Sequence, residues 1–282
     1  METSARIDAG AVARHITQWL HDYARGAGMD GFVVGISGGV DSAVTSRLCA
    51  DTGLPVTLVE MPIHSHRAQV ERGQEHIRNL CARHPLVSHV AVDLTGVYDR
   101  WVEALPEEED GSGGLALANG RARLRMTTLY ALAARRRALV AGTGNKIEDF
   151  GVGFYTKYGD GGVDLSPIAD LVKTEVFALG HHLGLPDAIL SAPPTDGLWG
   201  DDRTDEQQLG ASYPELEWAM AHSADLAAGS ASVELSPREQ EVLAIYQRLH
   251  RANRHKMDPI PVCVIPDDIR WGGRHAPPTR TV

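Results

Sequence analysis

Apolar residues follow two alternating patterns along this chain. Residues 8–25 carry Val12, Ile16, Trp19 and Leu20 at helical spacing, so an amphipathic helix is expected there. Short and almost wholly apolar runs follow, and runs of this kind between turn residues are typical of buried strands. The predicted strands cover residues 31–37, 55–62, 86–94 and 138–144.

Helical stretches separate these strands. They are predicted at residues 41–50, 66–82, about 95–105 and 115–137, with a further helix at 172–183. Strands that alternate with helices imply parallel pairing and right-handed crossovers. The predicted fold class is therefore α/β, an open, doubly wound and mostly parallel sheet flanked by helices. Ligands of such sheets bind beyond the carboxyl ends of the strands.

The organisation along the chain is predicted to be one domain covering residues 1–282. An N-terminal helix lies within 1–28, and the proline-rich segment 258–282 is expected to be an extended tail. Ser236, Pro237 and Glu239 form a capping-box start for a last helix before that tail. Two long polar loops are expected at 107–114 and 193–207.

Charge and cysteine content narrow the classes of function. The chain has 27 basic and 37 acidic residues, for a net charge of −10, which argues against nucleic-acid binding through bulk charge. The sequence shows no apolar signal core and no membrane span, so we expect a cytoplasmic protein. The chain has three cysteines, Cys49, Cys81 and Cys263. Their spacing is that of neither a disulfide framework nor a zinc site.

The first predicted strand runs into the sequence SGGVDS, residues 37–42. The Walker A loop requires a lysine before its Ser or Thr, and none is present; the dinucleotide-binding pattern G-x-G-x-x-G also fails here. Gly38 and Gly39 would let backbone N–H groups form an anion-binding nest at the start of the next helix. The loop is therefore predicted to bind phosphate groups.

Asp41 is unexpected beside a phosphate, because two anions repel each other. A Mg²⁺ ion between carboxylate and phosphate would resolve that repulsion, with Asp41 as a hard oxygen ligand. The alternative is a tight strand–helix turn in which Asp41 only caps the helix.

The loop resembles the PP-loop of ATP pyrophosphatases, which split ATP into AMP and pyrophosphate. Further stretches resemble NAD synthetases: GTGNKIEDFGVGFYTKYGDGGVDLSPIADLVKTEV at 142–176, NGRARLRM, PPTDGL followed by TDEQQLGASY, and the late HK pair. The similarity extends from about Gly31 to Lys256. It implies a Rossmann-like fold of the adenine-nucleotide α-hydrolase type, with the PP-loop after the first strand.

The resemblance also implies an activity. Family members adenylate the nicotinate carboxylate of deamido-NAD with ATP, and ammonia then displaces AMP to give NAD. The implied ligands are ATP, deamido-NAD, ammonia and Mg²⁺, and the family is commonly a homodimer.

Site residues carry over from the matching positions. The resemblance implies Asp41 and Lys173 as catalytic residues and Asp41 and Glu148 as Mg²⁺ ligands. ATP-binding positions are Gly35, Ile36, Ser37, Gly38, Gly39, Val40, Asp41, Ser42, Thr143, Lys173 and Thr195. Substrate-binding positions are Arg123, Lys157, Asp164, His255 and Lys256. The loop at 193–207 is expected to close over ATP.

Several alternatives remain open. A related PP-loop enzyme that amidates a different carboxylate would have much the same sequence, and the terminal stretch MDPIPVCVIPDDIRWGG departs from the short ending of the bacterial enzyme. A tRNA-modifying enzyme would be expected to show a basic extension or a cysteine pair. A nucleotide sensor would not need Asp41, Glu148 and Lys173 together. Only about thirty residues precede the first strand and none is Cys, so direct use of free ammonia is expected.

Overall fold

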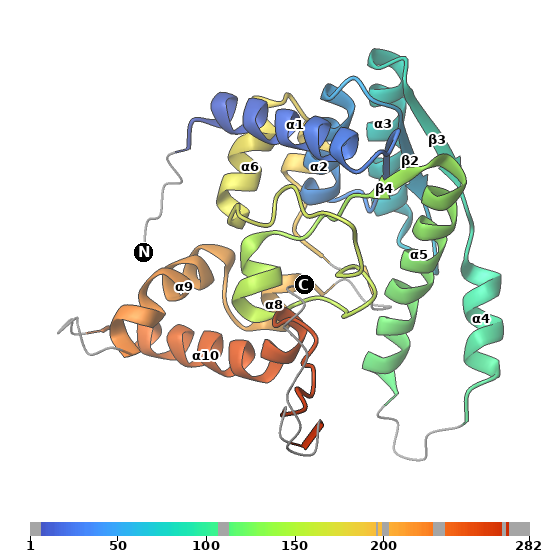
Figure 1. Ribbon diagram of the computed structural model, residues 1–282. Helices are drawn as coiled ribbons and strands as arrows, with labels where there is room; N and C mark the ends of the chain where they lie inside the picture. The colour runs from blue at the N-terminus through green and yellow to red at the C-terminus, as the bar shows by residue number, and fades with distance from the viewer. Residues whose placement is uncertain are drawn as a thin grey trace.

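The fold is built on a four-stranded parallel sheet (Figure 1). A computed structural model describes residues 7–106, 113–195, 197–198, 203–227, 235–266 and 269–270. The strand order is β3-β2-β1-β4. The strands are β1 (Gly31–Gly35), β2 (Val56–Glu60), β3 (Val87–Ala91) and β4 (Ala138–Val140).

Strand β1 is central, because it pairs with β2 on one side and with β4 on the other. Val33 aligns with Thr57 of β2 and with Val140 of β4. The chain moves outward from β1 through β2 to β3 and then returns to the other side of β1 as β4. The change of direction lies between β1 and β4, which is where doubly wound sheets form their ligand crevice.

Helices cover both faces of the sheet (Figure 1). Successive residues of β1 belong to cores on opposite faces. Phe32 and Val34 belong to the core beneath α1 (Ala9–Gly26), α2 (Val40–Asp51), α3 (Arg67–Arg83) and α6 (Lys173–His182). Val33 belongs to the opposite core, beneath α4 (Thr95–Glu103) and α5 (Gly114–Arg136). The doubly wound α/β fold expected from the sequence is confirmed.

A third core lies beside the sheet and consists mainly of helices. It packs η1 (Ile147–Val152), a short π-helix, against α9 (Tyr213–Ala227) and α10 (Pro237–Met257). Two short helices, α7 (Asp187–Leu190) and α8 (Asp205–Leu209), complete the described elements. Our sequence analysis assigned no element to η1, α7 or α8, and it placed no bounds on α9.

The predicted strands and helices lie within a few residues of the observed ones. The strands are shorter than the apolar runs, because residues 36–37, 61–62 and 141–144 leave the sheet and enter the loops at its edge. Residues 259–266 have no regular secondary structure, 269–270 are helical, and 267–268 and 271–282 lie outside the described residues, so the extended tail stays a prediction. Most of the predicted loop at 107–114 also lies outside them. None of the described helices is long and apolar enough to span a membrane.

His76 provides a prediction about stability and pH. It is almost fully buried between α2 and α3, with Nε2 2.8 Å from Ser46 Oγ. Burial, with a smaller contribution from Arg47, lowers the pKa of His76 from 6.5 to about 4. Below pH 6.5 the unfolded chain therefore binds a proton at His76 that the folded protein does not bind. The contribution of His76 to the free energy of unfolding is fully present above pH 6.5 and is lost as pH falls towards 4. We expect this group alone to remove about 3 kcal/mol over that window.

The measurement is urea denaturation of the wild-type protein and of His76→Gln at several pH values between 4 and 7.5. The difference between their unfolding free energies should shrink as pH falls, since glutamine does not titrate. A difference that stays constant across the window would show that His76 is not held neutral by the fold.

Candidate active site

The loop after β1 is held by a small hydroxyl network. Ser37 Oγ lies 3.1 Å from Ser42 Oγ and accepts a hydrogen bond from Gly39 N at 3.2 Å. Ser42 Oγ donates to Gly39 O and accepts from Ser37 N. The two serines therefore fix the turn in which residues 37–42 connect the central strand to α2.

The N-terminus of α2 faces the loop without a side-chain cap. Its N-cap is Gly39, which has extended backbone angles and no side chain to accept the first-turn N–H groups. The free amides and the positive end of the helix dipole are suited to an anion. Asp41 lies in this first turn but makes no capping hydrogen bond within the described residues, contrary to the alternative in which it is only a cap.

Gly38 shows why the loop needs glycine. Its φ is +85°, and a Cβ at this position would lie 2.3 Å from the carbonyl oxygen of Gln69 in α3. Any other residue would have both a strained backbone and a clash with a helix. The first turns of α3 thus pack directly against the outside of the loop.

Lys173 joins two acidic residues at the centre of the site. Its Nζ donates to Asp41 Oδ2 at 2.6 Å and to Glu148 Oε1 at 3.0 Å. The lysine side chain is 3% exposed, while those of Asp41 and Glu148 are 18% and 16% exposed. The residues come from three elements, α6, α2 and η1, so the fold itself assembles this cluster.

Two further side chains fix the carboxylates. Asn145 is fully buried; its Nδ2 donates to Asp41 Oδ1 at 3.1 Å, and its Oδ1 accepts the N–H groups of Ile147 and Glu148. Tyr213 donates its hydroxyl to Glu148 Oε1 at 2.5 Å, and its ring lies under Lys173 Nζ at 4.7 Å. The sequence analysis missed both residues, because an isolated Asn or Tyr has no distinctive spacing.

Burial and charge set the pKa values within the cluster. Desolvation, with Glu148 adding to it, raises the pKa of Asp41 although Lys173 opposes the change. Burial also acts to raise the pKa of Glu148, but Lys173 and the Tyr213 hydroxyl outweigh it and lower that pKa. The two carboxylates raise the pKa of Lys173 against the effect of burial, so the lysine stays charged.

Two further acids of the cavity that were not predicted, Asp149 and Asp160, have strongly raised pKa values. Burial, with smaller effects from Glu148, Asp160 and Asp41, raises the pKa of Asp149 to about 8. Burial also raises the pKa of Asp160 to about 6, although Asp160 Oδ1 accepts a hydrogen bond from Thr156 N. Gly144 leaves room for the first of them, since a Cβ there would lie 2.2 Å from Asp149 Oδ2. This part of the cavity therefore has an excess of acidic groups.

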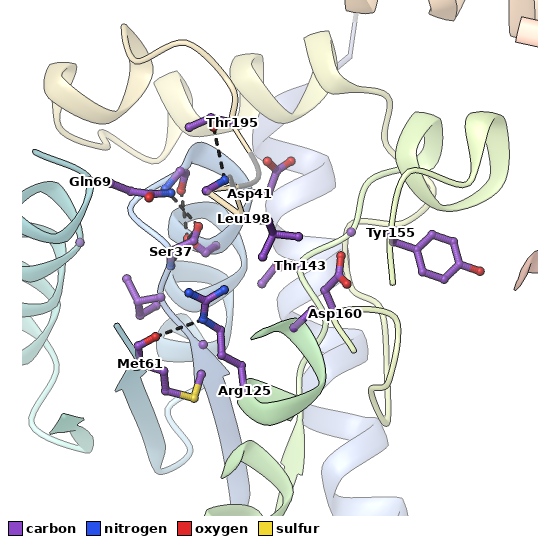
Figure 2. A pocket seen from close by; sticks show the side chains of 18 of the residues that line it. Ser37, Asp41, Met61, Gln69, Arg125, Thr143, Tyr155, Asp160, Thr195 and Leu198 are labelled. Carbon is purple, nitrogen blue, oxygen red and sulfur yellow. Dashed lines mark hydrogen bonds between the residues drawn. The ribbon is translucent and has the colours of Figure 1, made fainter. Parts of the chain in front are cut away.

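A cavity of about 260 Å³ opens at the carboxyl edge of β1 and β4 (Figure 2). Thr143 and Thr195 line it, as do Lys173 and Glu148. The predicted ATP-binding residues of the loop line it too, with the exception of Gly38, which faces α3. These lining residues are Gly35, Ile36, Ser37, Gly39, Val40, Asp41 and Ser42. The structure thus brings together the residues that the sequence assigned to ATP.

The described part of the loop at 193–207 lies against this cavity. Pro193, Pro194 and Leu198 are part of its lining, and Leu198 O accepts a hydrogen bond from Arg121 of α5 at 2.6 Å. On the other side, a Cβ at Gly197 would lie 2.7 Å from the amide of Gln69. The described part of the 193–207 loop therefore connects α5 to α3 beside the loop formed by residues 37–42.

The predicted substrate residues lie outside the cavity lining. Arg123 Nε donates to the carbonyl of Lys157 at 3.3 Å, and Lys157 Nζ donates to the carbonyl of His255 at 2.6 Å. Lys256 Nζ donates to the carbonyls of Gly153 and Tyr155. These four residues connect α5, the 153–157 segment and the end of α10.

Asp164 is separate from that group. Its carboxylate accepts hydrogen bonds from the hydroxyl of Tyr130 and from the N–H of Val140. It also lines a second, shallow pocket beside the exposed rings of Trp19, Tyr23 and Phe150. The structure therefore does not gather all the predicted substrate residues into one site within a single copy of the chain.

Asp41 and Glu148 offer the kind of ligands that Mg²⁺ takes. Both are carboxylates, they converge on one point, and acids outnumber bases around the cavity. No group of three or more His, Cys, Asp or Glu residues suited to a metal occurs in the described part of the chain. Two protein ligands are few for a dedicated cage, but they suit a Mg²⁺ ion that takes its other ligands from phosphates and water.

These features define a nucleotide-binding α/β protein: a parallel sheet, a glycine loop that leads from its central strand into an uncapped helix, and a buried carboxylate–lysine cluster. Comparison with known protein families specifies the class further. Residues 12–259 match the NAD synthase family, and the chain belongs to it.

Individual relatives are similar over most of their length. The NH₃-dependent NAD⁺ synthetase of Carboxydothermus hydrogenoformans is 38% identical over 246 residues, which are 86% of this chain and 92% of that protein. That of Methanosarcina acetivorans is 39% identical over 213 residues, 75% of this chain and 81% of the relative.

Solved structures share the fold. An NMN synthetase from Francisella tularensis has a TM-score of 0.76 at 29% identity, and the match covers 93% of this chain and 99% of that structure's chain. An NAD⁺ synthetase from Burkholderia pseudomallei has a TM-score of 0.66 at 26% identity, covering 90% of this chain and 91% of its own.

Proposed function

We propose that this protein is an ammonia-dependent NAD synthetase, a ligase that forms a carbon–nitrogen bond at the expense of ATP. A nicotinate carboxylate oxygen of deamido-NAD attacks the α-phosphorus, and the bond to the α–β bridging oxygen breaks, so that pyrophosphate leaves. Ammonia then attacks the acyl carbon, the bond to AMP breaks, and the nitrogen loses a proton. The products are NAD, AMP and pyrophosphate.

The observation that carries this proposal is the joint position of the loop and the cluster. The uncapped amides of α2 and the ammonium group of Lys173 border one cavity. Amides fixed by the Ser37–Ser42 network need no reorganisation to bind pyrophosphate, and this preorganisation is the main source of electrostatic catalysis. Family membership supports the same reaction.

We assign Mg²⁺ to Asp41 and Glu148. When bound, this ion supplies positive charge that neutralises the phosphates and the developing charge of the leaving pyrophosphate. Asn145 and Tyr213 hold the two carboxylates in place. Lys173 keeps their mutual repulsion small in the absence of nucleotide.

We place the dinucleotide acceptor on Arg123, Lys157, Asp164, His255 and Lys256, with a second copy of the chain completing the site. Support comes from their arrangement: the exposed Arg123–Lys157–His255 chain lies outside the ATP cavity, and Asp164 lies at a separate pocket. We therefore expect a second copy of the chain to supply part of the acceptor site. Sedimentation of the purified chain should accordingly give a dimer.

The test is incubation of the purified chain with ATP, Mg²⁺, ammonia and deamido-NAD. NAD, AMP and pyrophosphate are expected in equal amounts, measured by chromatography. ADP and orthophosphate instead would mean a different reaction. Glutamine in place of ammonia, with free ammonia removed, is the control and should give no turnover.

A second candidate differs only in the acceptor. The structural match to an NMN synthetase favours nicotinic acid mononucleotide, which has the same carboxylate but lacks the adenylate half. Parallel incubations with the two acceptors separate the candidates through their kcat/KM values. A higher value with the mononucleotide would assign this chain to NMN synthesis and leave the adenylation chemistry unchanged.

A further inference from the structure

The charge around the ATP cavity does not suit a polyanion. Among the described residues, six acidic side chains line the cavity: Asp41, Glu60, Glu148, Asp149, Asp160 and Asp205. Three cationic side chains of the same described set line it: Arg72, Arg125 and Lys173. Lys173 is already shared between two carboxylates. A triphosphate therefore needs positive charge from residues besides Lys173, in addition to any metal ion.

Arg72 is placed where such charge is needed. It lies on the second turn of α3, the helix that packs against the nucleotide loop, and its side chain lines the cavity. Its Nε donates to the carbonyl of Gly38 at 3.3 Å. The backbone of the next residue, Gly73, is also close to the loop, since a Cβ there would lie 3.5 Å from Gly38 N.

The contact with Gly38 leaves most of the guanidinium available. A guanidinium has five N–H donors in a planar fork, and the Gly38 carbonyl uses one of them. Among the described residues, no ion pair or further hydrogen bond involves the two Nη atoms of Arg72. Its Nη groups can therefore donate two parallel hydrogen bonds to phosphate oxygens.

We propose that Arg72 is a catalytic residue that binds the pyrophosphate portion of ATP and retains it as it leaves. The inference rests on the proposed function, because it assigns a role within the same adenylation. The Gly38 carbonyl fixes the guanidinium beside the loop, so the phosphates are held between the α2 amides on one side and a cation of α3 on the other. Arg72 supplies the positive charge that Lys173, paired with its two carboxylates, cannot.

The competing explanation is a structural brace, in which Arg72 only holds Gly38. Glutamine can keep a hydrogen bond to the Gly38 carbonyl but carries no charge, so Arg72→Gln separates the two roles. Arg72→Lys keeps the charge but loses the fork. Arg78→Gln is the matched control, because Arg78 is an exposed residue of the same helix.

The experiment is calorimetric titration of the full-length variants with inorganic pyrophosphate and, separately, with adenosine, in the presence of Mg²⁺. Loss of a charge-assisted bidentate contact should weaken pyrophosphate binding about 10- to 100-fold in Arg72→Gln. Adenosine binding should change by less than about twofold, and Arg78→Gln should resemble the wild type for both ligands. Arg72→Lys should recover part of the lost affinity.

The salt dependence of pyrophosphate binding is a second measurement. Arg72→Gln should not change it if Arg72 is only a structural brace. Pyrophosphate affinity of the wild type should fall more steeply with added salt than that of Arg72→Gln, because the variant has lost one charge contact. Equal weakening of pyrophosphate and adenosine binding, or wild-type pyrophosphate binding in Arg72→Gln, would overturn the inference. The binding assay is independent of turnover, so failure of the chain to make NAD would count against the proposed function alone.

Discussion

Asp41→Asn is expected to reduce NAD formation by about 10³-fold, with a similar loss in ATP–pyrophosphate exchange. Asparagine has nearly the same size, but it removes the negative charge that we assign to Mg²⁺ binding. It also replaces one carboxylate oxygen with an N–H donor, whereas in the wild type both oxygens accept hydrogen bonds, from Lys173 and Asn145. The loss should therefore appear in the adenylation step itself, and exchange of labelled pyrophosphate into ATP measures that step.

The size of the effect separates two roles for this residue. An acid in the first turn of a helix contributes about 0.3–1 kcal/mol of stability and nothing to chemistry. Glu71→Gln is a suitable control, because it removes an exposed acid of α3 that pairs only with Arg67 in the described structure. An Asp41→Asn enzyme with exchange activity near that of Glu71→Gln would eliminate the metal-ligand role.

The sequence predicted the sheet well because strand and helix patterns in this chain are local. The apolar run of β1 is buried on both faces, and its core residues Phe32 and Val33 serve opposite cores. Patterns of this kind depend on a few neighbouring residues. The strand order β3-β2-β1-β4 was not predicted, because the rule that parallel strands connect through right-handed crossovers leaves several orders open.

The π-helix η1 could not be predicted in the same way. Residues 147–152 are too few for a helical period, and Gly151 disfavours a helix by local propensity. A local side-chain contact and tertiary packing stabilise it instead: Asn145 accepts two of its N–H groups, and α10 packs against it.

The site was predictable to the extent that its residues lie in recognisable motifs. Asp41 comes from the loop at 37–42, and Glu148 and Lys173 come from the stretch at 142–176. The structure brings all three within hydrogen-bonding distance. Tyr213 was missed because only folding brings it to the cluster, whereas Asp149, which follows Glu148 in the sequence, was missed because no motif marks it as buried. Their burial, which distinguishes them chemically, cannot be read from a short stretch of sequence.

The second large effect is expected for Lys173→Met, which should destabilise the protein by about 3–5 kcal/mol at neutral pH. Methionine fills a similar volume but leaves Asp41 and Glu148, two buried carboxylates, without their shared cation. Breaking a buried pair from one side is costly because the remaining charges stay desolvated. Urea denaturation, followed by circular dichroism, measures the change.

The sign of the pH dependence follows from the remaining acids. Without Lys173, burial and mutual repulsion raise the folded-state pKa values of both carboxylates above their unfolded values. Such groups stabilise the folded protein at low pH, and that stabilisation is lost as pH rises. The stability difference between wild type and Lys173→Met should therefore widen from pH 5 to pH 8.

A second substitution tests whether uncompensated charge is the cause. Adding Glu148→Gln to Lys173→Met removes one of the two carboxylates, so the double variant should regain part of the lost stability and lose most of the pH dependence. If the double variant were less stable by the sum of the two single effects, the lysine would be acting through packing against Tyr213, which lies 4.7 Å from its Nζ. Activity should stay low in either case, because neither variant restores Lys173, which lines the ATP cavity and holds Asp41 and Glu148.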